Sequence, residues 1–259
     1  MREEEPAVVL TVTDAQGAVV RRLTGPAKAG FQRVAWDLRY PDPEPPALTP
    51  RRRGDWESDG GGPLVAPGTY QVSLAKRVGG RLTPLSQPQT FVCEAFADVS
   101  IPEPDPAARV AFQKQVADLW RSLQGTTRVF DDVSNNARLL TRALHDAPGS
   151  TEALAQEARS LQGRLVDLGV VLRGDDVKAQ YNEPAPPSLV ERVRQITDGA
   201  WEYTGPPTKT HRRNFEIADA DHRRALATLQ AIVADLEALG AKAEAAGAPW
   251  TPGRMPVWK

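Results

Sequence analysis

Residues 105–172 read DPAARVAFQKQVADLWRSLQGTTRVFDDVSNNARLLTRALHDAPGSTEALAQEARSLQGRLVDLGVVL, and the apolar positions of this stretch decide the fold. In its first half they recur at steps of three, four or seven residues: Phe112, Val116, Leu119, Leu123, Phe130, Ala137 and Leu144. After Pro148-Gly149 the pattern returns at Leu154, Ala158, Leu161, Leu165, Leu168 and Leu172. Such steps place side chains on one face of a helix, so the stretch predicts two antiparallel helices packed through their stripes.

Two further helices are predicted after this hairpin. Ser188 and Glu191 form a capping box, which is typical of a helix start, and the short helix ends near Trp201. A long helix is predicted over about 208–246, with apolar or small side chains three and four residues apart: Phe215, Ala218, His222, Ala225, Leu229, Ile232, Leu236 and Leu239. Together the helices predict an antiparallel four-helix bundle over residues 107–247.

The N-terminal part has the alternating pattern of β-strands. Strands are predicted over 8–14, 18–23, 31–40, 69–75 and 88–94, separated by turns that contain glycine or proline. Short strands spaced in this way favour a β-sandwich over residues 1–100. The fold class is therefore α+β in two domains. A Pro-rich linker at 101–106 is expected to hold the domains at a defined angle, and the tail 248–259, with Trp250 and Trp258, to fold back onto the bundle or the sandwich.

Composition excludes several classes of protein. Of the 259 residues, Lys and Arg number 32 and Asp and Glu 33, a net charge of −1, which argues against a general nucleic-acid binder or a protein held to anionic membrane by charge. No run approaches the ~18–20 apolar residues of a membrane span. The single cysteine, Cys93, permits no intrachain disulfide and is expected to be a small core residue. The acidic N-terminus lacks the apolar core of a signal peptide, so either the protein is cytoplasmic or the chain belongs to a longer precursor.

Two places carry candidate contact residues for a ligand or partner. The Pro/Gly/Arg-rich loop 41–67 contains Arg52 and Trp56, and basic residues beside an aromatic suit a phosphate or a sugar. The alternative is a solvated insertion between strands. Arg212 and Arg213, at the start of the last helix, are placed to reach an acidic partner, and a structural role is the alternative there.

No catalytic residue, cofactor or metal is assigned. Asp219 and His222 share a helix face, which resembles half of a carboxylate-bridged di-metal site, but Arg142 stands where the matching carboxylate before His145 would be needed. A hydrogen-bonded core histidine is the alternative. Phosphate-binding Gly-rich loops, Gly-x-Ser-x-Gly elbows and His-Glu-x-x-His motifs are not found.

Several motifs resemble a known family. Residues 12–17 (VTDAQG), 36–41 (WDLRYP) and 66–72 (APGTYQV) resemble an Ig-like, fibronectin-like sandwich of the flagellar hook-capping type. Over nearly all its length the chain resembles the C-terminal region of bacterial sortilin-like β-propeller proteins, which are often labelled glycosyl hydrolases with neuraminidase-type repeats. The helical half contributes residues 181–189 (YNEPAPPSL), 212–218 (RRNFEIA) and 248–253 (APWTPG) to this resemblance.

The resemblance implies a non-catalytic accessory or scaffold module in an extracytoplasmic setting, secreted or periplasmic as part of a longer precursor. Its expected partner is another protein or an upstream β-propeller. Any glycosyl hydrolase activity would belong to the propeller, which this sequence does not contain, and no Ser-x-Asp-x-Gly-x-x-Trp box is found. The alternative function is a carbohydrate-binding module that uses the 41–67 loop.

Overall fold

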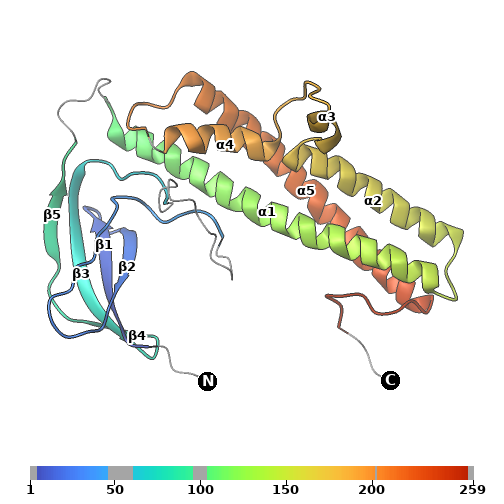
Figure 1. Cartoon of the computed structure of the whole chain (residues 1–259), viewed down its shortest axis with the longest axis horizontal. Helices are drawn as coiled ribbons and strands as arrows, with labels where there is room; N and C mark the ends of the chain where they lie inside the picture. The colour runs from blue at the N-terminus through green and yellow to red at the C-terminus, as the bar shows by residue number, and fades with distance from the viewer. Residues whose placement is uncertain (1–4, 46–60, 96–103, 202, 256–259) are drawn as a thin grey trace. The chain divides into compact units, whose positions relative to one another are not determined.

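The computed structural model describes residues 5–45, 61–95, 104–201 and 203–255. An antiparallel sheet of five strands precedes five helices in these ranges, so the predicted α+β organisation in two parts is confirmed (Figure 1). The predicted domain boundaries at 100 and 106 stay predictions, because they flank residues that lie mostly outside the described ranges.

Two compact units divide the chain, and each contains segments that are distant in sequence. The first consists of residues 1–118 with 198–207, and the second of residues 119–197 with 208–259. One long helix therefore contributes its first residues to the first unit and the remainder to the second.

The sheet follows the alternating sequence pattern. Its strands are β1 (Ala7–Asp14), β2 (Val19–Gly25), β3 (Gly68–Val78), β4 (Arg81–Pro84) and β5 (Gln89–Cys93). β1 lies between β2 and β3, while β4 and β5 share the other edge of β3, with β4 pairing along residues 75–78 and β5 along 68–72. Every described strand belongs to this one sheet, so the second sheet of a sandwich is not observed in the described ranges.

An aromatic cluster forms the core on one face of the sheet. The Tyr70 ring lies 5.8 Å from that of Trp36 and 6.0 Å from that of Phe91. Val12 and Val65 are buried beside them, and Cys93 packs against the cluster as a half-buried side chain. The Tyr70 hydroxyl donates a hydrogen bond to the Ala66 carbonyl at 2.6 Å, and burial raises the pKa of Tyr70 to about 12. Trp36, Tyr70 and Phe91 are thus core residues, as their spacing predicts.

The predicted strand over 31–40 is wrong. This segment is irregular apart from one bridge between Arg39 and Leu64. Leu38 has a φ of 59°, in the left-handed region, and the Asp37 carboxylate accepts a hydrogen bond from the Arg39 amide at 3.1 Å. Such a side-chain-to-backbone turn replaces the ladder of a strand. Trp36 still packs against the core cluster, although it does not lie in a strand.

Buried polar contacts fix the start of the long helix within the first unit. Arg109 donates to the Gln113 side chain at 2.8 Å and to the Leu64 carbonyl at 3.5 Å, and Gln113 donates to the Ala200 carbonyl at 2.5 Å. Arg39 donates to the Trp201 carbonyl at 3.0 Å. Both Arg109 and Gln113 are buried, so these bonds satisfy groups that would be costly to leave unpaired.

The helices begin and end close to the predicted positions. They are α1 (Pro106–Asp146), α2 (Glu152–Arg173), α3 (Asp176–Gln180), α4 (Leu189–Ala200) and α5 (Lys209–Ala245). The capping box is confirmed: the Ser188 amide donates to the Glu191 carboxylate at 2.8 Å, and the Glu191 amide donates to the Ser188 hydroxyl at 3.3 Å. The Ser188 amide and hydroxyl both donate to the Glu191 carboxylate and so lower its pKa. α3 was not predicted from the sequence.

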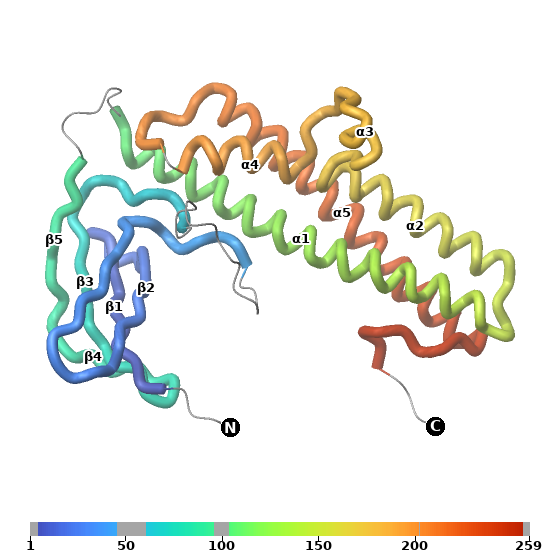
Figure 2. The backbone as a smooth tube through the Cα atoms, in the orientation of Figure 1, coloured from blue at the N-terminus to red at the C-terminus, as the bar shows by residue number. Residues whose placement is uncertain are grey.

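Contacts between residues distant in sequence define the relative directions of α1, α2 and α5. α1 and α2 are antiparallel, because Asp131 pairs with Arg173 while Thr141 accepts from Gln162. α1 and α5 are parallel, because the contacts between Thr126 and His222 and between Gly149 and Ala246 have nearly equal sequence separations. Figures 1 and 2 show α1 and α5 running side by side.

The predicted four-helix bundle is not confirmed. α4 contacts the early parts of its neighbours, through Arg194 over Trp120 of α1 and Arg192 to Asn214 of α5. α2 contacts later parts, as in the pair of Lys242 with Glu157. α2 and α4 follow each other along the α1–α5 pair (Figure 2), so the contacts at each level join three helices. In the described ranges no helix is both long and apolar enough to cross a lipid bilayer.

Candidate functional site

A groove between α2 and α5, here called the α2/α5 groove, is the candidate site of the second unit. It has a volume of about 440 Å³. Each helix contributes side chains spaced three and four residues apart, which therefore share one face. The lining residues are Arg164, Asp167, Leu168 and Val171 of α2 and Asp221, Arg224, Ala225 and Thr228 of α5.

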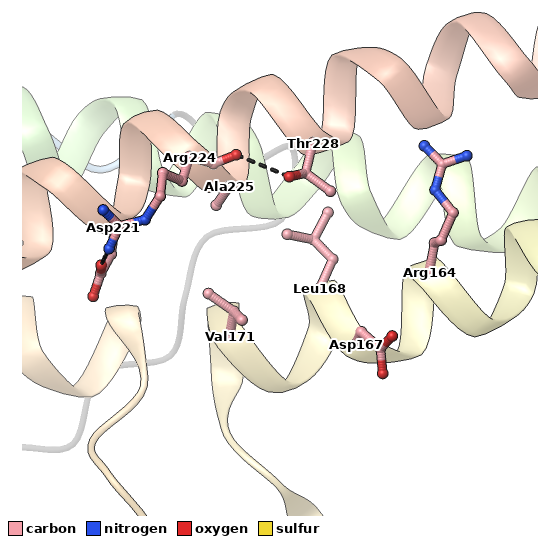
Figure 3. Close-up of a pocket in the computed structure, with 8 residues that line it drawn as sticks. All are labelled: Arg164, Asp167, Leu168, Val171, Asp221, Arg224, Ala225 and Thr228. Atoms are coloured by element: carbon pink, nitrogen blue, oxygen red, sulfur yellow. Dashed lines mark hydrogen bonds and ion pairs between the residues drawn. The ribbon is translucent and has the colours of Figure 1, made fainter.

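The floor of the groove is apolar and its ends are charged. Leu168 and Ala225 are buried, and in Figure 3 Leu168 and Val171 point from α2 toward α5. The Thr228 hydroxyl donates to the Arg224 carbonyl at 3.0 Å and so has a partner within its own helix. Arg224 pairs with Asp221, one turn earlier on α5. The polar groups of α5 at this groove are therefore already bonded within the chain.

A series of ion pairs fixes the register of α2 against α5. Glu157 pairs with Lys242 at 2.7 Å, and seven residues further along α2 Arg164 pairs with Asp235 at 2.5 Å. Seven residues are two helical turns, so in an antiparallel pair the next facing positions are Val171 and Thr228. Here a charged pair is replaced by a valine and a threonine, and both of them line the groove. The ion pairs between α2 and α5 therefore end at Arg164–Asp235, and the groove opens beside them.

Apolar side chains continue from the groove onto the outer surface of α2. Val166 is 68% exposed, Val171 46% and Val170 41%. Val177 and Tyr181, which follow the end of α2, are also exposed. Single exposed apolar residues are common on proteins, but a group beside a groove is typical of an interaction surface.

Of the four contact residues predicted from the sequence, the two that the structure describes, Arg212 and Arg213, do not line this groove. Arg52 and Trp56 lie outside the described residues, so their proposed role in the 41–67 loop stays a prediction. Arg212 and Arg213 are exposed in the first turns of α5, where Arg213 pairs with Glu216 at 3.1 Å. That pair joins positions of one helix, and the structure does not bring these arginines together with the groove residues.

The residues considered for a metal site have other partners. Asp219 accepts two hydrogen bonds from Arg223, at 3.0 and 3.1 Å. His222 is buried, and its Nε2 lies 3.1 Å from the Thr126 hydroxyl. Burial lowers the pKa of His222, opposed by the Asp219 charge. Over the described ranges, no group of three or more His, Cys, Asp and Glu side chains is placed to hold a metal ion. Asp131 of α1 likewise has a partner, because it pairs with Arg173 at 2.6 Å.

The sequence does contain a signal for the groove, although the apolar stripe of α2 obscured it. That stripe ends in Leu165, Leu168 and Leu172, whereas Val166, Val170 and Val171 lie off it. Valines beside a complete stripe indicate a second apolar surface on the same helix. The position of α5 is also needed to see that part of this surface faces a groove.

Comparison of the chain with protein-family models, with curated proteins and with solved structures gave no match.

Proposed function

We propose that this chain is a non-catalytic accessory module that binds another protein, and that the α2/α5 groove receives an apolar helix face of that partner. The observation that carries the proposal concerns the position that follows the Glu157–Lys242 and Arg164–Asp235 pairs. There Val171 and Thr228 face each other instead of a third ion pair, beside the apolar floor of the groove. A ladder of charged pairs keeps two helices in register, and an apolar gap in it leaves surface that a third element can bury.

The charges around the groove favour a protein partner over a small charged ligand. Arg164 is bonded to Asp235 and Arg224 to Asp221, so the positive groups at its ends are matched within the chain. A small anion would have to break these pairs. A partner helix with apolar residues three and four positions apart would instead contact the Leu168–Ala225 floor and leave the pairs intact.

The finer assignments of family and setting belong to this proposal as well. An Ig-like or fibronectin-like sandwich, a four-helix bundle and membership of a sortilin-like propeller protein rest on the sequence resemblance. The five-stranded antiparallel sheet followed by helices supports the broad organisation that the resemblance implies. On this proposal the module is extracytoplasmic, and the partner helix belongs to a propeller or to another protein.

Site-directed photocrosslinking in the source cell tests the proposal. A photoreactive phenylalanine analogue at Thr228 is expected to form a protein adduct of defined mass. Val171→Asp, which places a charge at the groove, is expected to abolish that adduct, because a carboxylate would lose its hydration against an apolar partner. Val92→Asp, at an exposed valine of β5 in the first unit, is the matched control and should retain it. An adduct that survives Val171→Asp, or none at Thr228, would contradict the proposal.

A further inference from the structure

Asp167 differs from the other charged residues of α2 in its contacts. Within the part of the chain that the structure describes, Asp167 forms no hydrogen bond or ion pair, although it lines the α2/α5 groove. Every other charged side chain of this helix has an ionic partner. These pairs are Glu152 with Arg159, Glu157 with Lys242, Arg164 with Asp235 and Arg173 with Asp131.

The neighbours of Asp167 on its own helix do not supply a cation to it. A cation three or four residues away is the partner that a helix can offer to an exposed carboxylate. One turn after Asp167 stand Val170 and Val171, and one turn before it stand Gly163 and Arg164. The Arg164 guanidinium lies 2.5 Å from an Asp235 oxygen and is therefore already paired with α5.

The surroundings of Asp167 on the outer surface are apolar. Val166, Val170 and Val171 are all exposed beside it. In Figure 3 the Asp167 carboxylate points away from α5, whereas Leu168 points toward that helix. Asp167 is therefore a single charge within an exposed apolar surface, at the α2 side of the groove.

An element that buried these valines would also take water away from Asp167. A carboxylate that loses hydration without gaining a partner costs free energy, and a cation at the right place on the incoming element offsets that cost. A wholly apolar or an acidic partner is disfavoured for this reason. Such charge matching sets which partner binds more than it sets the total affinity.

We propose that the helix received by the α2/α5 groove carries a lysine or arginine beside its apolar face, and that this cation pairs with Asp167. The inference rests on the proposed function, because it names the chemistry of that same partner. Apolar residues of the partner contact Leu168 and Val171, and Asp167 selects the charge at their edge. The ion pair of Arg164 with Asp235 stays intact in this arrangement.

Two synthetic helical peptides test the inference on the full chain. Both have leucines three and four positions apart with a photoreactive phenylalanine analogue among them, and they differ only in carrying lysines or glutamates beside that face. We expect the lysine peptide to give several times more adduct with the wild type than the glutamate peptide. Asp167→Lys should reverse this order. Because Asp167 is exposed, its replacement removes no packing contact of the core.

Glu237→Lys is the matched control. It makes the same change in net charge at an exposed position of α5 that does not line the groove. It follows Thr228 by about 2.5 helical turns, so the two residues lie on opposite sides of α5. This variant should keep the preference of the wild type for the lysine peptide. Added salt should reduce that preference, because it screens exposed charges.

The outcomes separate this inference from the proposed function. Equal yields with the two peptides, or a reversal that Glu237→Lys also produces, would overturn the inference alone when Val171→Asp still abolishes both adducts. Adducts that survive Val171→Asp, or no adduct with either peptide, would overturn the proposed function and the inference with it.

Discussion

His222 shows how one buried polar side chain makes the stability of the helices depend on pH. Burial disfavours its charged form, so its folded pKa lies below the ordinary value of 6.5, with Asp219 and Arg223 acting in opposite directions. The unfolded chain therefore binds more protons than the folded chain when the pH falls below 6.5, and the stability present above that pH is lost on acidification.

Replacing this histidine should weaken that dependence. We expect His222→Gln, which can still bond to the Thr126 hydroxyl, to show a smaller loss of unfolding free energy than the wild type between about pH 7 and pH 5. Urea denaturation followed by circular dichroism at each pH measures the difference. An equal loss in the two proteins would show that other groups cause the dependence.

At the scale of a single element, two glycines of α2 differ in what surrounds them. Gly163 is exposed and a Cβ there would meet no atom within 4 Å, whereas at Gly169 it would lie 3.1 Å from the Phe130 ring. Alanine favours a helix over glycine by about 1 kcal/mol. We expect Gly163→Ala to stabilise the protein by about 0.5–1 kcal/mol and Gly169→Ala to gain less or to destabilise it, as measured by denaturant midpoints. An equal gain at both positions would contradict this account.

The elements also show how far the sequence predicts the structure. The long helices are predicted well because each buries a regular stripe, and Ser188 with Glu191 marks a start by local chemistry. The segment 31–40 alternates like a strand, but the turn at Asp37 and the positive φ of Leu38 prevail over that pattern. α3 has no buried residue, so it leaves no apolar periodicity to detect, and its start depends on the Asp175 cap alone.

For the whole molecule, the long helix α1 is the element that both compact units share. Its first residues pack in the first unit, where Arg109 donates to the Leu64 carbonyl near the Tyr70–Ala66 bond, and residues 119–146 belong to the second. Local packing sets how well amides resist hydrogen exchange. We expect Tyr70→Ala, which opens the aromatic core, to accelerate exchange in residues 106–118 more than in 130–146, as mass spectrometry of peptides can show. Uniform acceleration along α1 would contradict this division.

The α2/α5 groove and the contact between α1 and α5 illustrate what a sequence cannot give without tertiary register. Val171 and Thr228 are 57 positions apart, and only the antiparallel alignment set by the Glu157–Lys242 and Arg164–Asp235 pairs brings them to one level. Thr126 and His222 are likewise brought together only by the parallel alignment of α1 and α5. A residue pattern gives the apolar face of each helix, but the pairing of faces depends on contacts between distant segments.

The parallel course of α1 and α5 has a consequence for the order of assembly. The α1–α2 hairpin closes through residues some tens of positions apart, whereas the α1–α5 contacts join residues about 100 positions apart. Closing a longer loop costs more chain entropy, and a growing polypeptide presents its early segments first. The hairpin should therefore form while α5 is still being synthesised. During translation, the surface of α1 that later contacts α5 remains uncovered by that helix.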